Sequence, residues 1–433
     1  MREDELIVYR EFKDGKILHD MVWLMDHYRS GDNKMRLLFF ECMHGLLEMA
    51  SVYGFTGNLW HCYLTNLLVS NENSYSVPCE LRGESEGSIN QLALHDIEIF
   101  KDFYDFDFTE MMDVLKAPEF SVVVNYQGAV TASRIYSTRI RNRICRLAEQ
   151  FAVTSNAGEM KALLAEFYRE YGVGKFGLHK AFRVVHEDEG ARIEPIRNIS
   201  HVQLSDLIGC EIPKKKLTDN TDAFVEGRKA NNCLLFGDAG TGKSTSIKAI
   251  ANEYYDKGLR IIELYKHQFQ DLNDVIAQIK NRNYKFIIYM DDLSFEEFET
   301  DYKYLKALIE GGLEKRPSNV LIYATSNRRH LIRENYSDKE GIREDMHAGD
   351  TVQEKLSLVY RFGVTIYFGG PDKKQFLEIV KGLASRYGIM MEEEELFAQA
   401  GKWELSHGGL SGRTAQQFID YLRGIGKNGS WQA

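Results

Sequence analysis

The run Gly237-Asp-Ala-Gly-Thr-Gly-Lys-Ser244 constrains the fold of this chain more than any other stretch. It matches the pattern G-x-x-x-x-G-K-[ST], and it follows an apolar run, Cys233–Phe236, that is typical of a strand. The residues after it, Ser246–Tyr255, have helical spacing. A glycine-rich turn between strand and helix lets backbone N–H groups converge on a phosphate at the amino end of the helix. The run therefore predicts a phosphate-binding loop in an α/β domain.

The motif also predicts what its polar side chains do. Lys243 supplies a positive charge to the β- and γ-phosphates, and the Ser244 hydroxyl ligates a magnesium ion. We therefore expect ATP and Mg²⁺ as ligands, and the chain has no N-K-x-D guanine signature. The expected nucleotide-binding residues of the loop are Gly237, Asp238, Ala239, Gly240, Thr241, Gly242, Lys243, Ser244 and Thr245.

A second apolar run, residues 284–290, ends in two carboxylates, Asp291 and Asp292. An acid at the end of a strand beside a phosphate loop can hold Mg²⁺, and a second one can polarise the attacking water. We assign Asp291 to the magnesium site and Asp292 to the water. The alternative, two solvated acids at a strand end, stays open at this point.

The two halves of the chain have different patterns. The first ~190 residues are mostly of helical spacing, with Phe120–Val124 as a candidate short strand. The motif G-x-G-x-x-G at Gly172–Gly177 follows a helical pattern, so Gly172 is interpreted as a helix C-cap.

The polar segment Glu187–Pro195 is the best candidate for a linker. After it, apolar runs alternate with helical stretches, which predicts a parallel sheet covered on both faces by helices. The five runs are Cys233–Phe236, Leu259–Leu264, Phe286–Met290, Val320–Ala324 and Val364–Phe368.

Composition narrows the classes of protein. The net charge of −10 gives no global attraction for nucleic acid or an anionic membrane. No apolar run reaches the ~18–20 residues of a membrane span, and the first residues lack the apolar stretch of a signal peptide, so we expect a cytoplasmic protein. The six cysteines have no regular spacing, which favours inert thiols in a reducing compartment.

The phosphate loop and the strand that ends in Asp291 and Asp292 are part of a set of motifs that resembles the AAA+ superfamily over roughly Leu204–Arg423. The resemblance implies that Ile208 and Gly209 pack against adenine, that Asn327 orients water against the γ-phosphate, and that Arg361 is an arginine finger. It also implies that Arg413 senses the nucleotide from a C-terminal helical lid. The alternatives are a turn asparagine at 327, a structural salt bridge for Arg361 and a solvated Arg413.

More narrowly, Asp291–Glu296 together with Ala324–His330 resembles a bacterial AAA+ family known mainly as an uncharacterised ATP-binding domain. The resemblance implies an α/β fold with a five-stranded parallel P-loop sheet and a C-terminal lid. The helical spacing of the first ~190 residues predicts a mainly helical domain before it. The expected domains are residues 1–190, of unknown role, 196–369, the α/β domain, and 370–427, the lid, with a tail at 428–433.

Two departures from the superfamily pattern bear on activity. The usual Asp-Glu pair is Asp291-Asp292 here, and the shorter second carboxylate predicts slow hydrolysis unless Glu296 or Glu297 replaces it. The connection after Leu264 is short, so Tyr265 or Phe269 is expected to be a packing residue rather than a substrate-threading one. The basic cluster formed by Arg328, Arg329, His330 and Arg333 is expected to be a solvated loop.

We therefore expect an Mg²⁺-dependent ATPase that acts as a homo-oligomer, with Arg361 reaching the site of a neighbouring subunit. Its client would be an unidentified protein or nucleic acid, and we expect no membrane partner. Two alternatives remain: a nucleotide-dependent switch or scaffold with little turnover, favoured by Asp292, and a DNA-associated loader.

Overall fold

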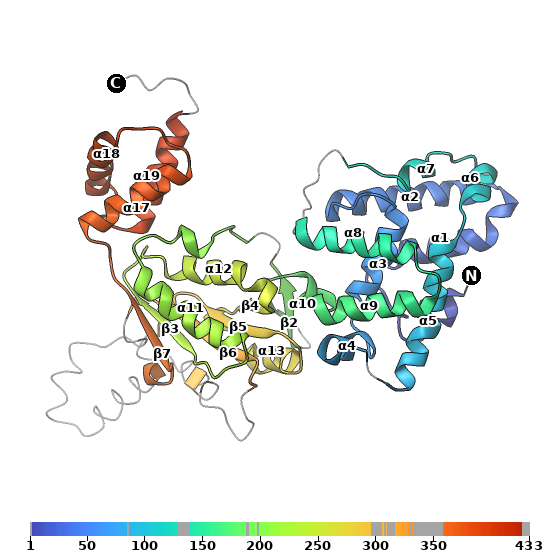
Figure 1. The fold of residues 1–433 in the computed structure, drawn as a ribbon, viewed down its shortest axis with the longest axis horizontal. Helices are drawn as coiled ribbons and strands as arrows, with labels where there is room; N and C mark the ends of the chain where they lie inside the picture. The colour runs from blue at the N-terminus through green and yellow to red at the C-terminus, as the bar shows by residue number, and fades with distance from the viewer. Residues whose placement is uncertain are drawn as a thin grey trace. The chain divides into compact units, whose positions relative to one another are not determined.

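The computed structural model describes residues 2–84, 86–128, 138–187, 190–196, 199–295, 317–328 and 358–426, together with 305, 306, 309 and 331. The chain divides into two compact units, Met1–His179 and Lys180–Ala433. Figure 1 draws the first unit in blue to teal and the second in green to red. The expected tail, 428–433, and the basic residues Arg329, His330 and Arg333 lie outside the described residues.

The first unit is helical, as its spacing predicts, and α3 is its most buried helix. Every residue of α3 from Leu59 to Val69 except His61 is buried, and the indole N–H of Trp60 donates to the Phe103 carbonyl at 3.0 Å. Burial on all sides requires neighbours on all sides, and α3 contacts α2, α5, α8 and α10. The helices are α1 (Lys16–His27), α2 (Asn33–Tyr53), α3 (Leu59–Ser70), α4 (Ser76–Arg82), α5 (Ser88–Asp105), α6 (Thr109–Leu115), α7 (Phe120–Val123), α8 (Thr138–Ala152), α9 (Ala157–Tyr171) and α10 (Gly174–Leu178).

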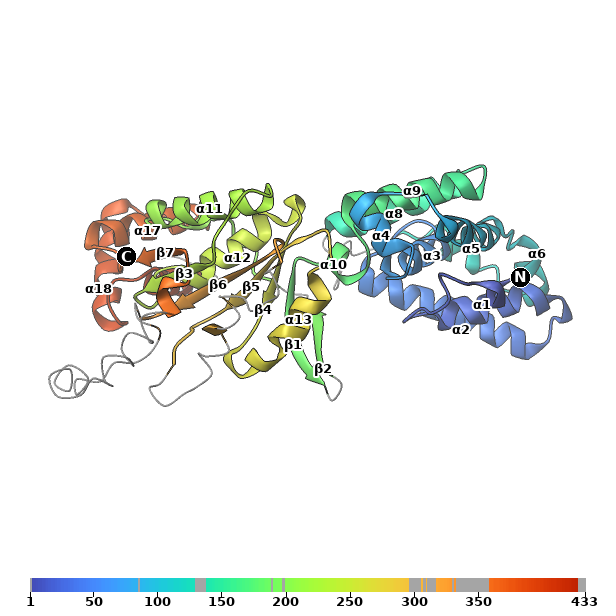
Figure 2. The ribbon, with the colours of Figure 1, turned by 90° about the horizontal axis from the view of Figure 1, so that it is seen from below.

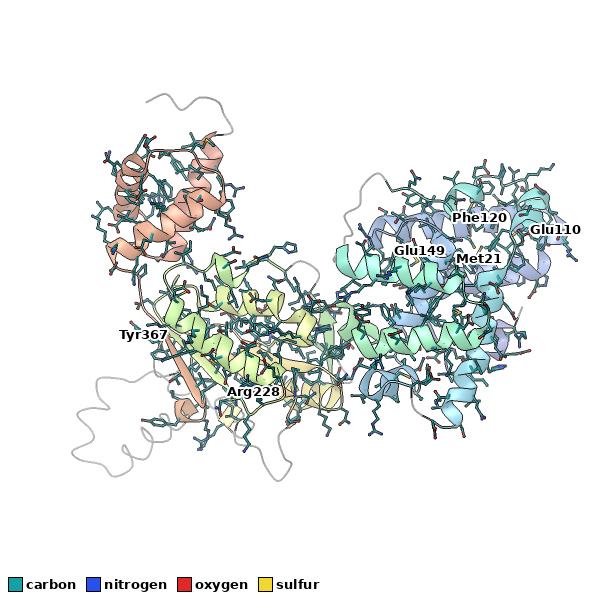
Figure 3. The ribbon with its side chains drawn as sticks, in the orientation of Figure 1. Met21, Glu110, Phe120, Glu149, Arg228 and Tyr367 are labelled. Carbon is teal, nitrogen blue, oxygen red and sulfur yellow. The ribbon has the colours of Figure 1, made fainter. Side chains whose placement is uncertain are left out.

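The prediction of a strand at Phe120–Val124 is wrong, because these residues form the short helix α7. Phe120 is fully buried, and its ring lies 4.9 Å from that of Phe39 and 4.7 Å from that of Phe108 (Figure 3). The apolar run therefore reflects aromatic packing rather than a strand. The interpretation of Gly172 as a C-cap is confirmed, since it follows α9 with a φ of 80° and donates to the Tyr168 carbonyl.

A buried carboxylate on α5 fixes the N-terminal segment of the first unit. Asp96 is fully buried, and it accepts the backbone N–H groups of Ile7 at 3.0 Å, Val8 at 2.6 Å and Tyr9 at 2.8 Å. A carboxylate can be buried at acceptable cost only when such donors replace the water it loses.

The second unit is built on a seven-stranded sheet of order β2-β1-β4-β5-β6-β3-β7. All neighbouring strands are parallel except β2, which is antiparallel to β1. The five predicted strands are all present and adjacent, which confirms the parallel P-loop sheet. The strands are β1 (Ala181–Glu187), β2 (Gly190–Pro195), β3 (Cys233–Gly237), β4 (Leu259–Glu263), β5 (Lys285–Met290), β6 (Val320–Ser326) and β7 (Val364–Phe368).

The segment that we interpreted as a linker is instead the β1–β2 hairpin, which extends the sheet at one edge. Phe182 pairs with Pro195 and Glu187 pairs with Gly190. The polarity of this segment has a physical cause, because β2 is an edge strand with only Ile193 buried.

Helices cover both faces of the sheet, as predicted. In Figures 1 and 2, α11 (Glu211–Val225) and α12 (Lys243–Glu253) lie over one face, and α13 (Leu272–Ile279) lies over the other. Alternate residues of the central strands, such as Leu235, Ile261 and Ile287, join one core cluster with residues of α11 and α12. Both faces are therefore apolar, and the polar chemistry of the sheet is left to its strand ends.

The predicted C-terminal lid is present as three helices, α17 (Lys373–Arg386), α18 (Glu393–Ser406) and α19 (Gly412–Gly426). They share a core of their own that includes Phe376, Val380, Leu396, Phe418 and Ile419. Among the helices of the described part of the chain, none is both long and apolar enough to span a membrane.

Replacing Asp96 by Ala is expected to destabilise the first unit by about 3 kcal/mol, because the N–H groups of Ile7, Val8 and Tyr9 lose a buried acceptor, and that of Tyr9 is itself buried. Hydrogen exchange at the amides of residues 7–9 should accelerate in the variant. The control is Asp102→Ala on the same helix, where an exposed ion pair with Arg2 should contribute less than about 1 kcal/mol. Unchanged exchange at residues 7–9 in Asp96→Ala would contradict the role we give to Asp96.

Candidate functional site

Three neighbouring strands bring the candidate site together at their carboxyl ends, along one side of the sheet. The strands β3, β5 and β6 run parallel, so the residues that follow them emerge at the same edge. The phosphate loop follows β3, Asp291 follows β5, and Asn327 follows β6. Motifs that are 36 to 90 residues apart in the sequence are thus adjacent in the fold.

The loop begins with a very close backbone approach between β3 and β7. Gly237 has a φ of 135°, and a Cβ at this position would overlap the carbonyl oxygen of Phe368. The next residue, Asp238, donates its N–H to that carbonyl at 3.2 Å and accepts the N–H of Gly370 at 3.0 Å through Oδ2. Glycine is therefore required at 237, and the end of β7 holds the loop in place.

The Lys243 ammonium lies inside the loop and connects it to the end of β6. Lys243 is 6% exposed, and Nζ donates to the carbonyls of Gly237 at 2.8 Å and Asp238 at 2.6 Å, and to Asn327 Oδ1 at 3.0 Å. Burial lowers the pKa of Lys243, while the nearby carboxylates of Asp238, Asp292 and Asp291 oppose that shift. The ammonium is thus directed at the space that the loop encloses.

Asp291 is the centre of a compact set of oxygen and nitrogen atoms. Its Oδ1 accepts the hydroxyls of Ser244 at 2.8 Å and Thr325 at 2.5 Å, and the backbone N–H of Asp292 at 3.1 Å. Burial alone would raise the pKa of Asp291, but hydrogen bonds from Thr325, Ser244 and the Asp292 N–H lower it. Asp291 is therefore held as a carboxylate next to Ser244, as the predicted magnesium site requires.

Thr325 is a site residue that the sequence analysis did not assign. It is buried at the end of β6, and besides its bond to Asp291 it accepts the Asp292 N–H through Oγ1 at 3.0 Å. The sequence holds one indication of it, because a threonine two residues before Asn327 interrupts an apolar strand. Recognising the role of Thr325 also requires the register in which β5 and β6 pair.

Asp292 lies beside Asn327 with an unusual backbone. Its φ is 49°, in the left-handed region, and its Oδ1 accepts the Asn327 side-chain N–H at 2.9 Å. Asn327 therefore contacts both Lys243 and Asp292. The two residues that we expect to handle the water are brought together by the fold.

The lid touches the phosphate loop through the first turn of α19. The Arg413 N–H donates to the Gly240 carbonyl at 3.3 Å, and Ser411 and Arg413 leave little space beside Gly240. The Arg413 side chain is exposed, and its charge contributes to lowering the pKa of Lys243, although less than burial does. Arg413 thus lies at the loop, as the resemblance implies.

The segment expected to contact adenine lies against the lid. Ile208 packs directly on the Gly382 backbone of α17, and Gly209 faces Ile379 of the same helix. An ion pair between Asp206 and Arg386, with 2.9 Å between Oδ2 and Nη2, joins the same two segments. Leu207 lies close to Gly242 of the loop, so this segment connects the lid and the phosphate loop.

Arg361 is not brought to the same place. It precedes β7, whose first residue Val364 pairs with Cys233 and whose last, Phe368, pairs with Gly237. The strand from Val364 to Phe368 spans about 13 Å. Arg361 therefore lies beyond the amino end of β7, at the opposite edge of the sheet from the phosphate loop.

The other predicted residues have the following positions. Ala239 is exposed at the tip of the loop, the Thr241 hydroxyl donates to the Asp238 carbonyl at 2.8 Å, and Thr245 is partly exposed in α12. Phe269 is buried, whereas Tyr265 is exposed and stacks on His267. Glu296 and Glu297 lie outside the described residues.

The donor set fits Mg²⁺ bound together with a phosphate chain. Among the residues that the structure describes, no group of three or more His, Cys, Asp or Glu side chains could hold a metal ion. Magnesium, however, usually takes one or two protein oxygens, completing its shell with phosphate and water. Ser244 and Asp291 supply such oxygens beside a glycine loop that a Cβ at Gly237 would close.

Comparisons with known proteins identify the family to which the chain belongs. A family model described as "Protein of unknown function (DUF815)" matches residues 177–426. No curated protein matches the chain. Its likeness to the Thermotoga maritima RuvB Holliday junction branch migration motor has 18% identity and a TM-score of 0.37, covering 52% of this chain and 65% of that one. The likeness to a mutant of that RuvB has 18% identity and a TM-score of 0.38, and it covers 52% of this chain and 66% of the mutant chain. The chain therefore spans just under two thirds of these RuvB chains.

Replacing Gly237 by Ala is expected to destabilise the second unit by about 2–4 kcal/mol and to weaken binding of a fluorescent ATP analogue more than ~10-fold. The added methyl group would meet the Phe368 carbonyl, and alanine disfavours a φ of 135°. Gly401→Ala in α18 is the control, because nothing lies near its Cβ and alanine favours a helix. Normal binding by Gly237→Ala would contradict the close approach of β3 and β7.

Proposed function

The chain belongs to the DUF815 family of proteins of unknown function, and from that premise we propose that it is a magnesium-dependent ATPase of the AAA+ type. The observation that carries the proposal is a continuous set of hydrogen bonds at one edge of the sheet. Asn327 bonds to both Lys243 and Asp292, while Asp291 bonds to Ser244. A cation for phosphate, two oxygens for a metal and a polar pair for water are thus within one site.

The residues of the loop have separate tasks in binding. Backbone N–H groups of the glycine turn and the amino end of α12 would face the phosphates, and Lys243 would donate to their oxygens. Ser244 and Asp291 would hold Mg²⁺, which neutralises charge on the phosphates when bound. Ile208 and Gly209 would contact the base next to α17.

Asp292 and Asn327 are proposed to orient the attacking water. The Asn327 side chain holds the Asp292 carboxylate by a direct hydrogen bond of 2.9 Å, which fixes one of its two oxygens. The second oxygen can then accept a proton from water at the γ-phosphate. The left-handed backbone at Asp292 gives this short carboxylate a direction that an extended backbone would not give.

Arg361 is proposed to act on the nucleotide of a neighbouring subunit. Its position beyond the amino end of β7 puts it too far from its own phosphate loop for a side chain to reach. A guanidinium that enters from a second copy can stabilise charge on the γ-phosphate in the transition state. The active form would therefore be a homo-oligomer, whose cycle acts on an unidentified protein or nucleic acid.

Contacts of the lid suggest how such a cycle would be transmitted. Gly240 of the loop bonds to Arg413 of α19, and the Ile208–Gly209 segment packs on α17. A nucleotide that binds between these elements would contact both, so its γ-phosphate would bias the position of the lid.

Arg361→Ala is expected to lower the ATPase rate about 10³-fold or more while changing ATP affinity less than ~3-fold, because the side chain acts only in the transition state. Specific activity of the wild type should rise with protein concentration. The measurement is phosphate release against protein concentration, with ATP affinity measured separately.

Two variants control this experiment. Lys243→Ala should lose ATP affinity by roughly 10–100-fold, because a buried charged donor is removed. Arg228→Ala removes an exposed arginine of the same unit, paired with Glu226 at 2.6 Å (Figure 3), and should leave the rate unchanged. Equal specific activity at all concentrations, with Arg361→Ala as active as the wild type, would overturn the trans assignment.

A nucleotide-dependent switch with little turnover is the second candidate, and the geometry of Asp292 favours it. This carboxylate is shorter than glutamate, and one of its oxygens is already bonded to Asn327. ATP would then order the lid and a binding surface without being hydrolysed quickly.

Asp292→Asn separates the two candidates. Asparagine tolerates the left-handed backbone, so the fold and ATP affinity should persist. If Asp292 activates water, the rate in single-turnover assays should fall about 10²–10⁴-fold. If the wild type binds ATP with no measurable turnover and Asp292→Asn behaves identically, the ATPase proposal fails and the switch remains.

A further inference from the structure

Two cysteines that are far apart in the sequence meet inside the first unit. Cys62 lies on α3 and Cys145 on α8, and their Sγ atoms are 3.9 Å apart across a sequence separation of 83 residues. The sulfurs need to approach by only about 2 Å to reach the length of an S–S bond. Both residues are free cysteines in the structure. Their spacing in the sequence gives no indication of this proximity.

The two thiols differ in accessibility. Cys62 is 2% exposed, with the Thr56 carbonyl 3.5 Å from its Sγ. Cys145 is partly exposed on α8, and Glu149, which follows it by one helical turn, is exposed. Cys145 is therefore the more accessible of the two residues, and Cys62 is close enough to react with Cys145 afterwards.

Their electrostatic environments separate them further. The hydrogen bond from Cys62 lowers the pKa of Cys145 to about 7; burial opposes this, and the Thr56 N–H and the Arg141 charge favour it. The same hydrogen bond raises the pKa of Cys62, and burial adds to it. Cys145 is thus the thiol that reacts first with an external disulfide, and Cys62 is the thiol that reacts second.

The other four cysteines lack these properties. Cys42, Cys79 and Cys233 are buried, and burial raises the pKa of each of them, to about 12 for Cys42. Cys210 is partly exposed, but burial also raises its pKa. A reagent that reacts with thiolates should therefore select Cys145.

We propose that Cys62 and Cys145 form a reversible thiol–disulfide site that reacts with low-molecular-weight disulfides such as oxidised glutathione. The proposal assigns a chemistry to the helical unit and is independent of the ATPase proposal, since every residue that carries it lies in Met1–His179.

The reaction proceeds in two exchanges. The Cys145 thiolate attacks one sulfur of oxidised glutathione, which forms a mixed disulfide and releases one glutathione thiolate that takes up a proton. Cys62 then loses its proton to solvent and attacks Cys145 Sγ, and the second glutathione leaves as a thiolate that is protonated in turn. Two protein thiols are oxidised to one disulfide, and one oxidised glutathione is reduced to two glutathione molecules.

The product would connect α8 covalently to the most buried helix of the unit. Because α8 also packs on α9 and α5, the bond would fix a junction of four helices. Reduction by excess thiol would release it.

The test uses the reduced full-length protein under native conditions with oxidised glutathione, quenched by alkylation and analysed by mass spectrometry. The intact protein is expected to lose two hydrogen atoms without gaining glutathione, and the free thiols should fall from six to four. Combined cleavage by trypsin and chymotrypsin releases residues 61–63 and 144–146, each with one cysteine, and these should be joined.

Variants separate the two steps. Cys62→Ser should stop at the first step and keep one glutathione on Cys145, whereas Cys145→Ser should give neither product. Cys210→Ser is the matched control and should form the same joined peptides as the wild type. If Cys62→Ser does not fold, the peptide map of the wild type still decides.

Three results would overturn the proposal. They are no reaction under native conditions, stable glutathione on wild-type Cys145 without the joined peptides, and a disulfide that joins any other pair of cysteines.

Discussion

The backbone pairing of β3 between β6 and β7 is the interaction on which the candidate site depends. One partner of β3 brings Asn327 to the loop, and the other brings the Phe368 carbonyl against Gly237. If the pairing of β7 with β3 shifted by one residue, a side chain would lie in the space beside Gly237 that now admits only backbone atoms. Strand register therefore sets the shape of the phosphate loop before any nucleotide contact is considered.

Within the site, polar groups of the protein provide the hydrogen bonds that water would otherwise make to the charged side chains. Lys243 and Asp291 are both charged groups at the end of an apolar sheet, and each is compensated by several local partners. Such compensation makes a charged site compatible with the packed core directly beneath it. These partners are carbonyl and amide oxygens and hydroxyl groups. A phosphate or a metal ion could replace them when it binds.

Local patterns predicted much of this arrangement. The phosphate loop and Asp291 were identifiable because each follows an apolar strand, and strand-end chemistry depends on nearby sequence. Asn327 was assigned through the resemblance to the AAA+ superfamily. Thr325 was missed because its role depends on how β5 and β6 pair. The β1–β2 hairpin was mistaken for a linker because an exposed edge strand has the composition of a loop, and Phe120 was mistaken for a strand residue because aromatic packing favours both structures. The proximity of Cys62 and Cys145 depends on helix packing across 83 residues, which no local pattern encodes.

The left-handed backbone at Asp292 limits which residues position 292 can hold at low free-energy cost. Glycine, asparagine and aspartate enter that region more readily than other residues, so a glutamate at 292 would hold this backbone at a higher free-energy cost than Asp292 does. Exchanging Asp292 for glutamate therefore changes the backbone energy of this turn as well as the reach of the carboxylate.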